Sequence, residues 1–211
     1  AAECRVAAPE AFAARCEKLR QLLDEANQVT NLTRIVEPEE YSVKHVADSL
    51  SIGKFFPEFA TERLEIADIG CGAGFPSLVL ALAYPKLRIT AIDSTGKKTA
   101  FVENAAKALD LANLRVVTGR SRELNCRGEF KHRFDVVTAR AVAAAAVIVA
   151  DARNFPNRNG RFILYKTPEQ LKTDLPEVRA LDKKNPLNWE VTPVFEVAPG
   201  VGERQFLYSL R

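Results

Sequence analysis

From residue 64 onward, short β-rich runs alternate with segments of helical periodicity, and this alternation restricts the chain to a few fold classes. Seven runs rich in branched and aromatic residues predict strands at 64–69, 88–92, 114–118, 134–138, 161–166, 190–197 and 205–210. Helical patterns fill four of the intervals, at 75–83, 97–110, 142–154 and 168–181. Strand–helix–strand units of this length favour right-handed crossovers, so we expect an α/β, Rossmann-like fold with a mostly parallel seven-stranded sheet and helices on both faces.

The last two runs are expected to pair antiparallel, because no helical pattern separates them. Between them lies Pro199-Gly200-Val201-Gly202, which is typical of a turn. Pro193 interrupts the sixth run, and proline cannot donate a hydrogen bond to a neighbouring strand. The sixth run is therefore expected at a sheet edge or around a bulge.

Residues 1–60 follow a different pattern. Apolar side chains recur at helical spacing over residues 10–28, and a second helix is predicted from Pro38 to about Leu50. We expect a small helical extension (1–60) that packs on an α/β domain (61–211). The length of 211 residues and the 47% of hydrophobic residues suit one domain with an extension. The longest apolar run has ten residues, whereas about 20 are needed to span a bilayer, so no membrane partner is expected.

Three of the ten glycines fall within five residues, in the segment from Asp68 to Pro76 that follows the first predicted strand and opens a helix. Nucleotides bind at this position in doubly wound sheets, and glycine lets the backbone approach a ligand closely. Asp93 ends the second strand 23 residues after Gly70, near the spacing expected for a carboxylate that binds a ribose diol. The segment therefore predicts a nucleoside-containing cofactor.

The glycine spacing distinguishes two cofactors. A dinucleotide fingerprint G-x-G-x-x-G would need glycine at position 75, where this chain has Phe75. The pattern present is G-x-G-x-G preceded by Asp68, which is associated with S-adenosylmethionine (AdoMet). An NAD-linked oxidoreductase is therefore the weaker alternative. No metal is expected, because the four cysteines form no CxxC spacing and the chain has two histidines.

Several blocks together resemble the AdoMet-dependent guanine-N7 methyltransferases of bacterial 16S ribosomal RNA, the GidB/RsmG family. The resemblance covers about residues 19–166. It rests on Asn31-Leu32-Thr33, the block from His45 to Leu50, the Gly-Phe-Pro ending of the glycine segment, Asp93 to Lys98, Gly119-Arg120-Ser121 and Phe134 to Ala141.

The resemblance and the glycine segment together imply a set of cofactor-binding residues: Gly70, Cys71, Gly72, Gly74, Phe75, Asp93, Ser94, Ser121, Arg122 and Arg140. Arg140 is also the candidate catalytic residue, with a strand-end salt bridge as the alternative. One position departs from the family pattern, because the second adenine-flanking residue is usually acidic and here is Arg122, followed by Glu123. A backbone contact would tolerate this change, whereas a side-chain contact would not.

The implied chemistry needs no general base. Guanine N7 carries a lone pair and no proton, so an enzyme has only to hold N7 in line with the sulfonium methyl for an SN2 transfer. A cysteine nucleophile, which methylation of a ring carbon would require, is not favoured here, because Cys71 lies within the cofactor loop. Exocyclic amine methylation usually shows an Asn/Asp-Pro-Pro-aromatic motif, and this chain has Thr138-Ala139-Arg140 instead.

The formal net charge of +3 is too small to indicate a partner, so RNA binding would depend on local clusters. The candidate RNA contacts are Lys97, Lys98, Lys166 and His45; a solvated strand-end lysine and a core histidine are the alternatives for the last two. The family resemblance implies an enzyme that acts on a guanine in the 530 loop of 16S rRNA, free or in the small ribosomal subunit, and we expect a cytoplasmic monomer. The alternatives are a small-molecule methyltransferase, with the N-terminal helices as a lid, and a non-catalytic AdoMet- or RNA-binding module.

Overall fold

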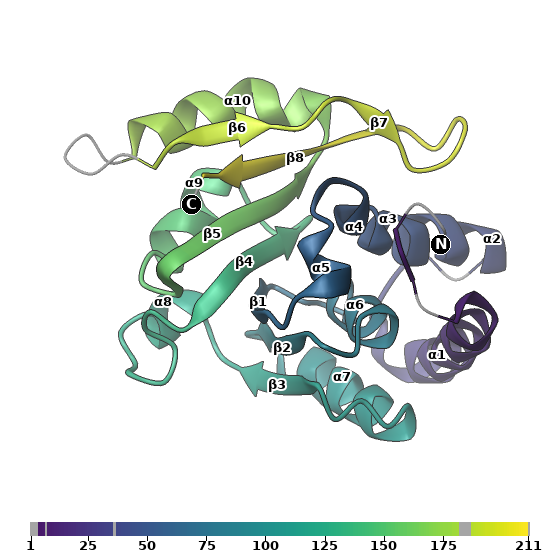
Figure 1. Cartoon of the computed structure of the whole chain (residues 1–211). Coiled ribbons are helices and arrows are strands. Elements are labelled where there is room, and N and C mark those ends of the chain that lie inside the picture. The colour runs from purple at the N-terminus through teal and green to yellow at the C-terminus, as the bar shows by residue number, and fades with distance from the viewer. Residues whose placement is uncertain (1–3, 7, 36, 182–186, 211) are drawn as a thin grey trace.

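The computed structural model describes residues 4–6, 8–35, 37–181 and 187–210. One twisted sheet forms its centre (Figure 1), with the strand order β3-β2-β1-β4-β5-β8-β6. The first five strands are parallel, as predicted: β1 (Glu65–Ile69), β2 (Arg88–Asp93), β3 (Leu114–Thr118), β4 (Phe134–Arg140) and β5 (Pro156–Lys166). The order steps outward from β1 in both directions, so the carboxyl ends of β1 and β4 lie side by side.

The C-terminal strands add an antiparallel edge. β8 (Glu203–Ser209) pairs antiparallel with β5, with β6 (Trp189–Val191) and with β7 (Phe195–Glu196). The antiparallel pairing is confirmed, but the single strand predicted over 190–197 is wrong. The chain leaves the sheet around Pro193, which gives two short strands and a total of eight strands in the described part of the chain.

Helices cover both faces of the sheet, as predicted. Along β4, Val136 packs into one hydrophobic cluster and Val137 into the other, because successive strand residues point to opposite faces. The first cluster contains residues of α6 (Ser77–Ala83) and α7 (Gly96–Ala108). The second contains residues of α9 (Ala145–Asp151) and α10 (Pro168–Ala180). The short helix α8 (Ser121–Leu124) was not predicted, and the helix predicted over 142–154 is shorter at both ends.

The N-terminal helices pack on the face of the sheet that α6 and α7 cover. α1 (Pro9–Thr30) contacts α6 and α7, and its buried residues Phe12, Cys16, Leu19 and Leu23 belong to the same hydrophobic cluster as the sheet. The second predicted helix contains a π-helical centre, η1 (Tyr41–Ala47), flanked by short helices: α2 (Pro38–Glu40), α3 (Asp48–Leu50) and α4 (Ile52–Phe55). α5 (Glu58–Thr61) then leads into β1. Among the residues that the structure describes, no helix is long and apolar enough to cross a membrane.

Candidate functional site

The glycine loop turns the chain sharply at the carboxyl end of β1. Gly70, Gly72 and Gly74 have φ angles of 68°, 55° and 88°, in the left-handed region that glycine adopts without strain. A Cβ on Gly70 would lie 2.5 Å from the side chain of Val142, and a Cβ on Gly74 would lie 2.4 Å from that of Leu78. Close packing therefore reinforces the requirement for glycine at both positions.

Asp93 braces this loop from the end of β2. Its carboxylate accepts hydrogen bonds from the backbone N–H of Gly72 at 3.0 Å and of Thr95 at 2.8 Å. A carboxylate offers about four acceptor positions, so Asp93 keeps capacity for two further donors such as ribose hydroxyls. Asp93 therefore lies next to the glycine loop, where the sequence places it.

Asp68, near the end of β1, is buried beneath the loop with 1% exposure. Ser77 donates a hydrogen bond to its Oδ2, whereas Oδ1 has no hydrogen-bond partner among the described residues. Burial raises the pKa of this carboxyl to about 6. Asp68 therefore carries an unused acceptor at the base of the loop.

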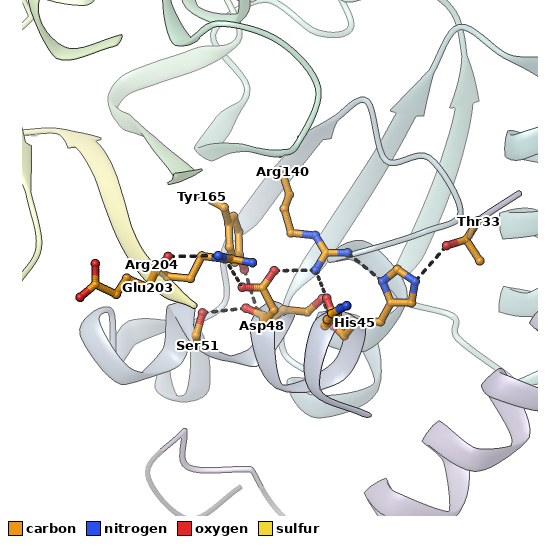
Figure 2. Close-up of polar contacts among 10 residues, drawn as sticks. Thr33, His45, Asp48, Ser51, Arg140, Tyr165, Glu203 and Arg204 are labelled. Carbon is orange, nitrogen blue, oxygen red and sulfur yellow. Dashed lines mark hydrogen bonds and ion pairs between the residues drawn. The ribbon is translucent and has the colours of Figure 1, made fainter. Parts of the chain in front are cut away.

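Arg140 ends β4 and connects three residues of the N-terminal helices (Figure 2). Its Nη1 donates to Asp48 Oδ2 and to the backbone carbonyl of Lys44, each at 2.8 Å. Its Nη2 lies 3.2 Å from Nδ1 of His45. Arg204, from β8, donates from Nε to the other carboxylate oxygen of Asp48 at 3.1 Å. Sequence reasoning identified Arg140 and His45, but not Asp48 or Arg204.

The π-helical turn η1 supplies two of these partners. A π-helix bonds residues five apart instead of four, and such turns are frequent at functional sites. Lys44 and His45 both lie in η1, and Asp48 follows its last residue. The turn therefore brings a carbonyl, an imidazole and a carboxylate to one guanidinium.

His45 is buried and neutral. Burial and the positive charge of Arg140 lower its pKa to about 3. Because a guanidinium can only donate, Nδ1 accepts the bond from Arg140 and the ring proton lies on Nε2, which faces Thr33 Oγ1 at 3.3 Å. The ring stacks on Phe75, with centroids 4.1 Å apart and planes 6° apart. One face of Phe75 is therefore already covered.

These groups surround a cavity of about 510 Å³ at the carboxyl end of the sheet. Nine of the predicted site residues line it: His45, Gly70, Cys71, Gly72, Phe75, Asp93, Lys98, Arg140 and Lys166. Further lining residues that sequence reasoning did not identify include Thr33, Lys44, Asp48, Val142, Tyr165, Thr167, Gln170 and Arg204.

The other predicted residues lie outside the lining of this cavity: Gly74, Ser94, Lys97, Ser121 and Arg122. Ser94 and Arg122 are exposed, and Ser121 is half-buried at the start of α8. Lys97 donates from Nζ to the carbonyl of Thr30 at the end of α1, 3.1 Å away. The roles assigned to these residues stay predictions.

Lys166 is buried, with 5% exposure, so the alternative of a solvated strand-end lysine is wrong. Its Nζ lies 2.7 Å from Asp174 Oδ2 and donates to the carbonyl of Ala143 at 3.1 Å. Asp174 also accepts from the backbone N–H of Ala145, the first residue of α9. The pair therefore anchors the segment 141–144, which runs along the cavity. The RNA contact expected of Lys166 stays a prediction.

Three features of the site fit AdoMet: the open backbone at Gly72, the acceptor capacity of Asp93 and the acceptor of Asp68 that has no partner in the described part of the chain. A Cβ on Gly72 would meet no atom closer than 3.9 Å, so the loop backbone is open to a ligand there. Asp93 has acceptor capacity for hydroxyl groups, and Asp68 has a buried acceptor without a partner among the described residues. Within the described ranges, no group of three His, Cys, Asp or Glu side chains is placed to hold a metal ion.

Comparisons with known proteins identify the family. The GidB family model, described as rRNA small subunit methyltransferase G, matches residues 13–193. The protein named ribosomal RNA small subunit methyltransferase G from Limosilactobacillus reuteri (strain DSM 20016) is 38% identical over 168 residues, which are 78% of this chain and 70% of the relative. Its counterpart from Solibacter usitatus is 35% identical and covers 92% of this chain and 89% of its own length.

Solved structures show the same fold at lower identity. Aeropyrum pernix fibrillarin, with natively bound S-adenosyl-L-methionine, has a TM-score of 0.54 and 17% identity, and the match covers 71% of this chain and 67% of fibrillarin. The fold is thus a Rossmann-like methyltransferase fold. Since the family model spans most of the sequence and the relatives exceed 30% identity, this chain belongs to the GidB family, rRNA small subunit methyltransferase G.

Proposed function

We propose that this chain transfers a methyl group from AdoMet to N7 of a guanine in the 530 loop of 16S rRNA. Its family is named for methylation of small-subunit rRNA, and the finer assignment of atom and nucleotide is our inference. The observation that carries it is the state of His45, which lines the cavity with its Nδ1 lone pair bonded to Arg140 and a pKa of about 3. His45 therefore offers no free lone pair as a general base, which agrees with transfer to N7, an atom that carries no proton.

Bound AdoMet supplies an electrophilic methyl group for an in-line SN2 transfer. The chain's own residues bind and orient the reactants: Gly72 and Asp93 form the loop wall, and Arg140 lines the cavity at the end of β4. Three hydrogen bonds hold Arg140 in place before any ligand arrives. Preorganised positioning of this kind is the main catalytic device available where no proton is moved.

Local positive charge supports RNA as the substrate. Arg120, Arg122, Arg127 and Lys131 are exposed on and after the turn that follows β3. Lys44 and Lys98 add positive charge at the cavity itself. Phosphate contacts by such groups would hold the RNA while one guanine enters the cavity, and extrusion of a base is a common device in enzymes that modify nucleic acids. We propose a monomeric, cytoplasmic enzyme acting on 16S rRNA or the small ribosomal subunit.

The test uses labelled AdoMet and ribosomal RNA from cells that lack the modification. Label mapped to a guanine N7 in the 530 loop supports the proposal; label on another atom or nucleotide contradicts it. AdoMet binding without transfer would indicate a non-catalytic module, and transfer to a small molecule alone would indicate a small-molecule methyltransferase.

Arg140→Ala is expected to lower kcat about 100-fold, since a displaced positioning group costs that order of rate. Arg88→Gln, an exposed arginine paired with Glu65 at the far end of β2, is the matched control.

A further inference from the structure

The carboxylate of Asp48 is shared by two arginines from strands that are not neighbours in the sheet (Figure 2). Oδ2 accepts from Arg140 on β4 and Oδ1 accepts from Arg204 on β8. The side chains of Asp48 and Arg140 are 7% and 11% exposed, whereas that of Arg204 is 26% exposed. Asp48 therefore links the last strand of the chain to the candidate catalytic arginine.

Because Asp48 accepts from both arginines, it determines the orientation of the Arg140 guanidinium. A carboxylate that faces one guanidinium favours a two-bonded pair, with both oxygens on the same arginine. Here Arg204 occupies Oδ1, so Arg140 contacts Asp48 through Oδ2 alone. Arg140 consequently keeps Nη2 directed at His45 and shares Nη1 with the Lys44 carbonyl.

The backbone beside Asp48 is fixed independently. Tyr165, on β5, donates its hydroxyl to the carbonyl of Ser49 at 2.7 Å, and both residues are buried. Removal of the Arg204 guanidinium would therefore leave the Asp48 backbone in place and free only its Oδ1. The side chains of Asp48 and Arg140 could then rotate into the two-bonded pair, which would pull Nη2 away from His45.

We propose that Arg204 is a positioning residue, which keeps Arg140 in its productive orientation by occupying Oδ1 of Asp48. The kinetic consequence rests on the proposed function, but the structural consequence does not. Because the chain contains two histidines, ¹⁵N-histidine labelling gives a spectrum simple enough to follow His45 directly. The imidazole nitrogens of His45 report whether Arg140 still donates to Nδ1.

The experiment compares Arg204→Gln and Arg204→Lys with the wild-type chain. In the glutamine variant we expect the His45 nitrogen signals to move, kcat to fall about tenfold or more, and KM for AdoMet to stay within about twofold. Lysine restores a cationic donor to Oδ1 without the guanidinium fork, so its effects are expected to be smaller. If the glutamine variant does not fold, Arg204→Met removes the donor with a side chain of similar length, and the same His45 signals decide the proposal.

Arg88→Gln again serves as the control, since it removes the same charge at the opposite end of the sheet and is expected to change neither readout. Unchanged His45 signals in Arg204→Gln would overturn the proposal, even if kcat fell, because Arg204 would then act by another route such as RNA contact. If the wild-type chain transfers no methyl group to RNA, the proposed function fails, and the histidine spectra still decide the role of Arg204.

Discussion

Two buried titratable residues near the glycine loop have pKa values shifted in the directions that favour their neutral forms. The pKa of Asp68 is raised to about 6 and that of His45 is lowered to about 3, chiefly because burial disfavours the charged form of each. The ordinary pKa of histidine is 6.5, so the unfolded chain takes up a proton at His45 as the pH falls below 6.5, whereas the folded chain does not. The free energy of unfolding therefore decreases as the pH falls from 6.5. Ionisation of Asp68 opposes folding as the pH rises from 3.8 through about 6.

Asp68→Asn is expected to stabilise the chain at high pH only. Near pH 4 the native Asp68 carboxyl is protonated, and asparagine replaces it with little change in free energy. At pH 8 the wild-type chain must keep a buried carboxylate ionised, so the variant is expected to be more stable by about 1–3 kcal/mol. The measurement is the free energy of unfolding of both chains at pH 4 and pH 8. The contribution of His45 is common to both and cancels in the difference; a variant that is less stable at pH 8 would contradict the argument.

At the residue scale, the sequence allowed prediction of contacts that depend on one strand and the turn after it. The glycines, Asp93 and Arg140 all lie at strand ends, and the parallel order brings those ends together. Asp48 and Arg204 could not be chosen in this way, because Asp48 lies 92 positions from Arg140 and 156 positions from Arg204. The residues around Arg204 in the sequence do not indicate that it will donate a hydrogen bond to Asp48.

Among the elements, the segment 141–144 differs from its prediction, because residues 142–144 lie outside α9 although a helix is expected over 142–154. Its composition of small apolar residues favours helix, yet Ala141 has a φ of 54° and Ala144 has a ψ of 142°, both outside the helical region, so α9 begins at Ala145. Tertiary contacts decide the outcome: Lys166 binds the carbonyl of Ala143 and Asp174 caps Ala145. Helix propensity is a weak preference that such contacts override.

The buried pair Lys166–Asp174 is expected to be a stability determinant for this segment. Lys166→Met leaves the Asp174 carboxylate buried without its cation, which typically costs about 3–5 kcal/mol. Adding Asp174→Asn removes the unpaired charge while an amide oxygen can still accept from Ala145, so the double variant is expected to recover most of that stability. Urea unfolding measures both.

Lys172→Met is the control for that measurement, because Lys172 pairs with Glu169 on the same helix and both side chains are more than two-thirds exposed. Exposed pairs contribute about 0–1 kcal/mol, so this variant should be nearly neutral. A Lys166→Met variant as stable as Lys172→Met would show that Asp174 finds another partner.

For the whole molecule, one hydrophobic cluster joins the N-terminal helices to the sheet. The second cluster, on the other face, contains Trp189, the single tryptophan of the chain. The predicted division at residue 60 therefore has a direct test. The 22 residues of α1 contribute strongly to the far-UV circular dichroism signal. We expect this signal and the fluorescence of Trp189 to report unfolding at the same denaturant midpoint. An earlier circular-dichroism transition would show that residues 1–60 unfold separately.

The small net charge also has a consequence at this scale, since RNA affinity must depend on a few local contacts. Replacing Arg120, Arg122 and Arg127 by Gln is expected to reduce the slope of log K against log salt by about 0.7–0.9 for each phosphate that the variant no longer neutralises. Filter binding with 16S rRNA at several salt concentrations gives the slope.

The matched control removes three other exposed positive charges: Lys107, Lys172 and Arg88, each of which is paired with a glutamate. If both triple variants change the slope equally, binding follows total charge and the local cluster has no special role.

The place of β8 within the sheet constrains how the protein can be made. β8 lies between β5 and β6, although both are synthesised before it. While the chain emerges from the ribosome, the edge of β5 stays unpaired and β6 has no neighbour until residues 203–209 follow. An unpaired strand edge invites association with other chains, so the growing protein passes through an aggregation-prone stage. Arg204 lies in the same strand, so its hydrogen bond to Asp48 can form only after residue 204 has been synthesised.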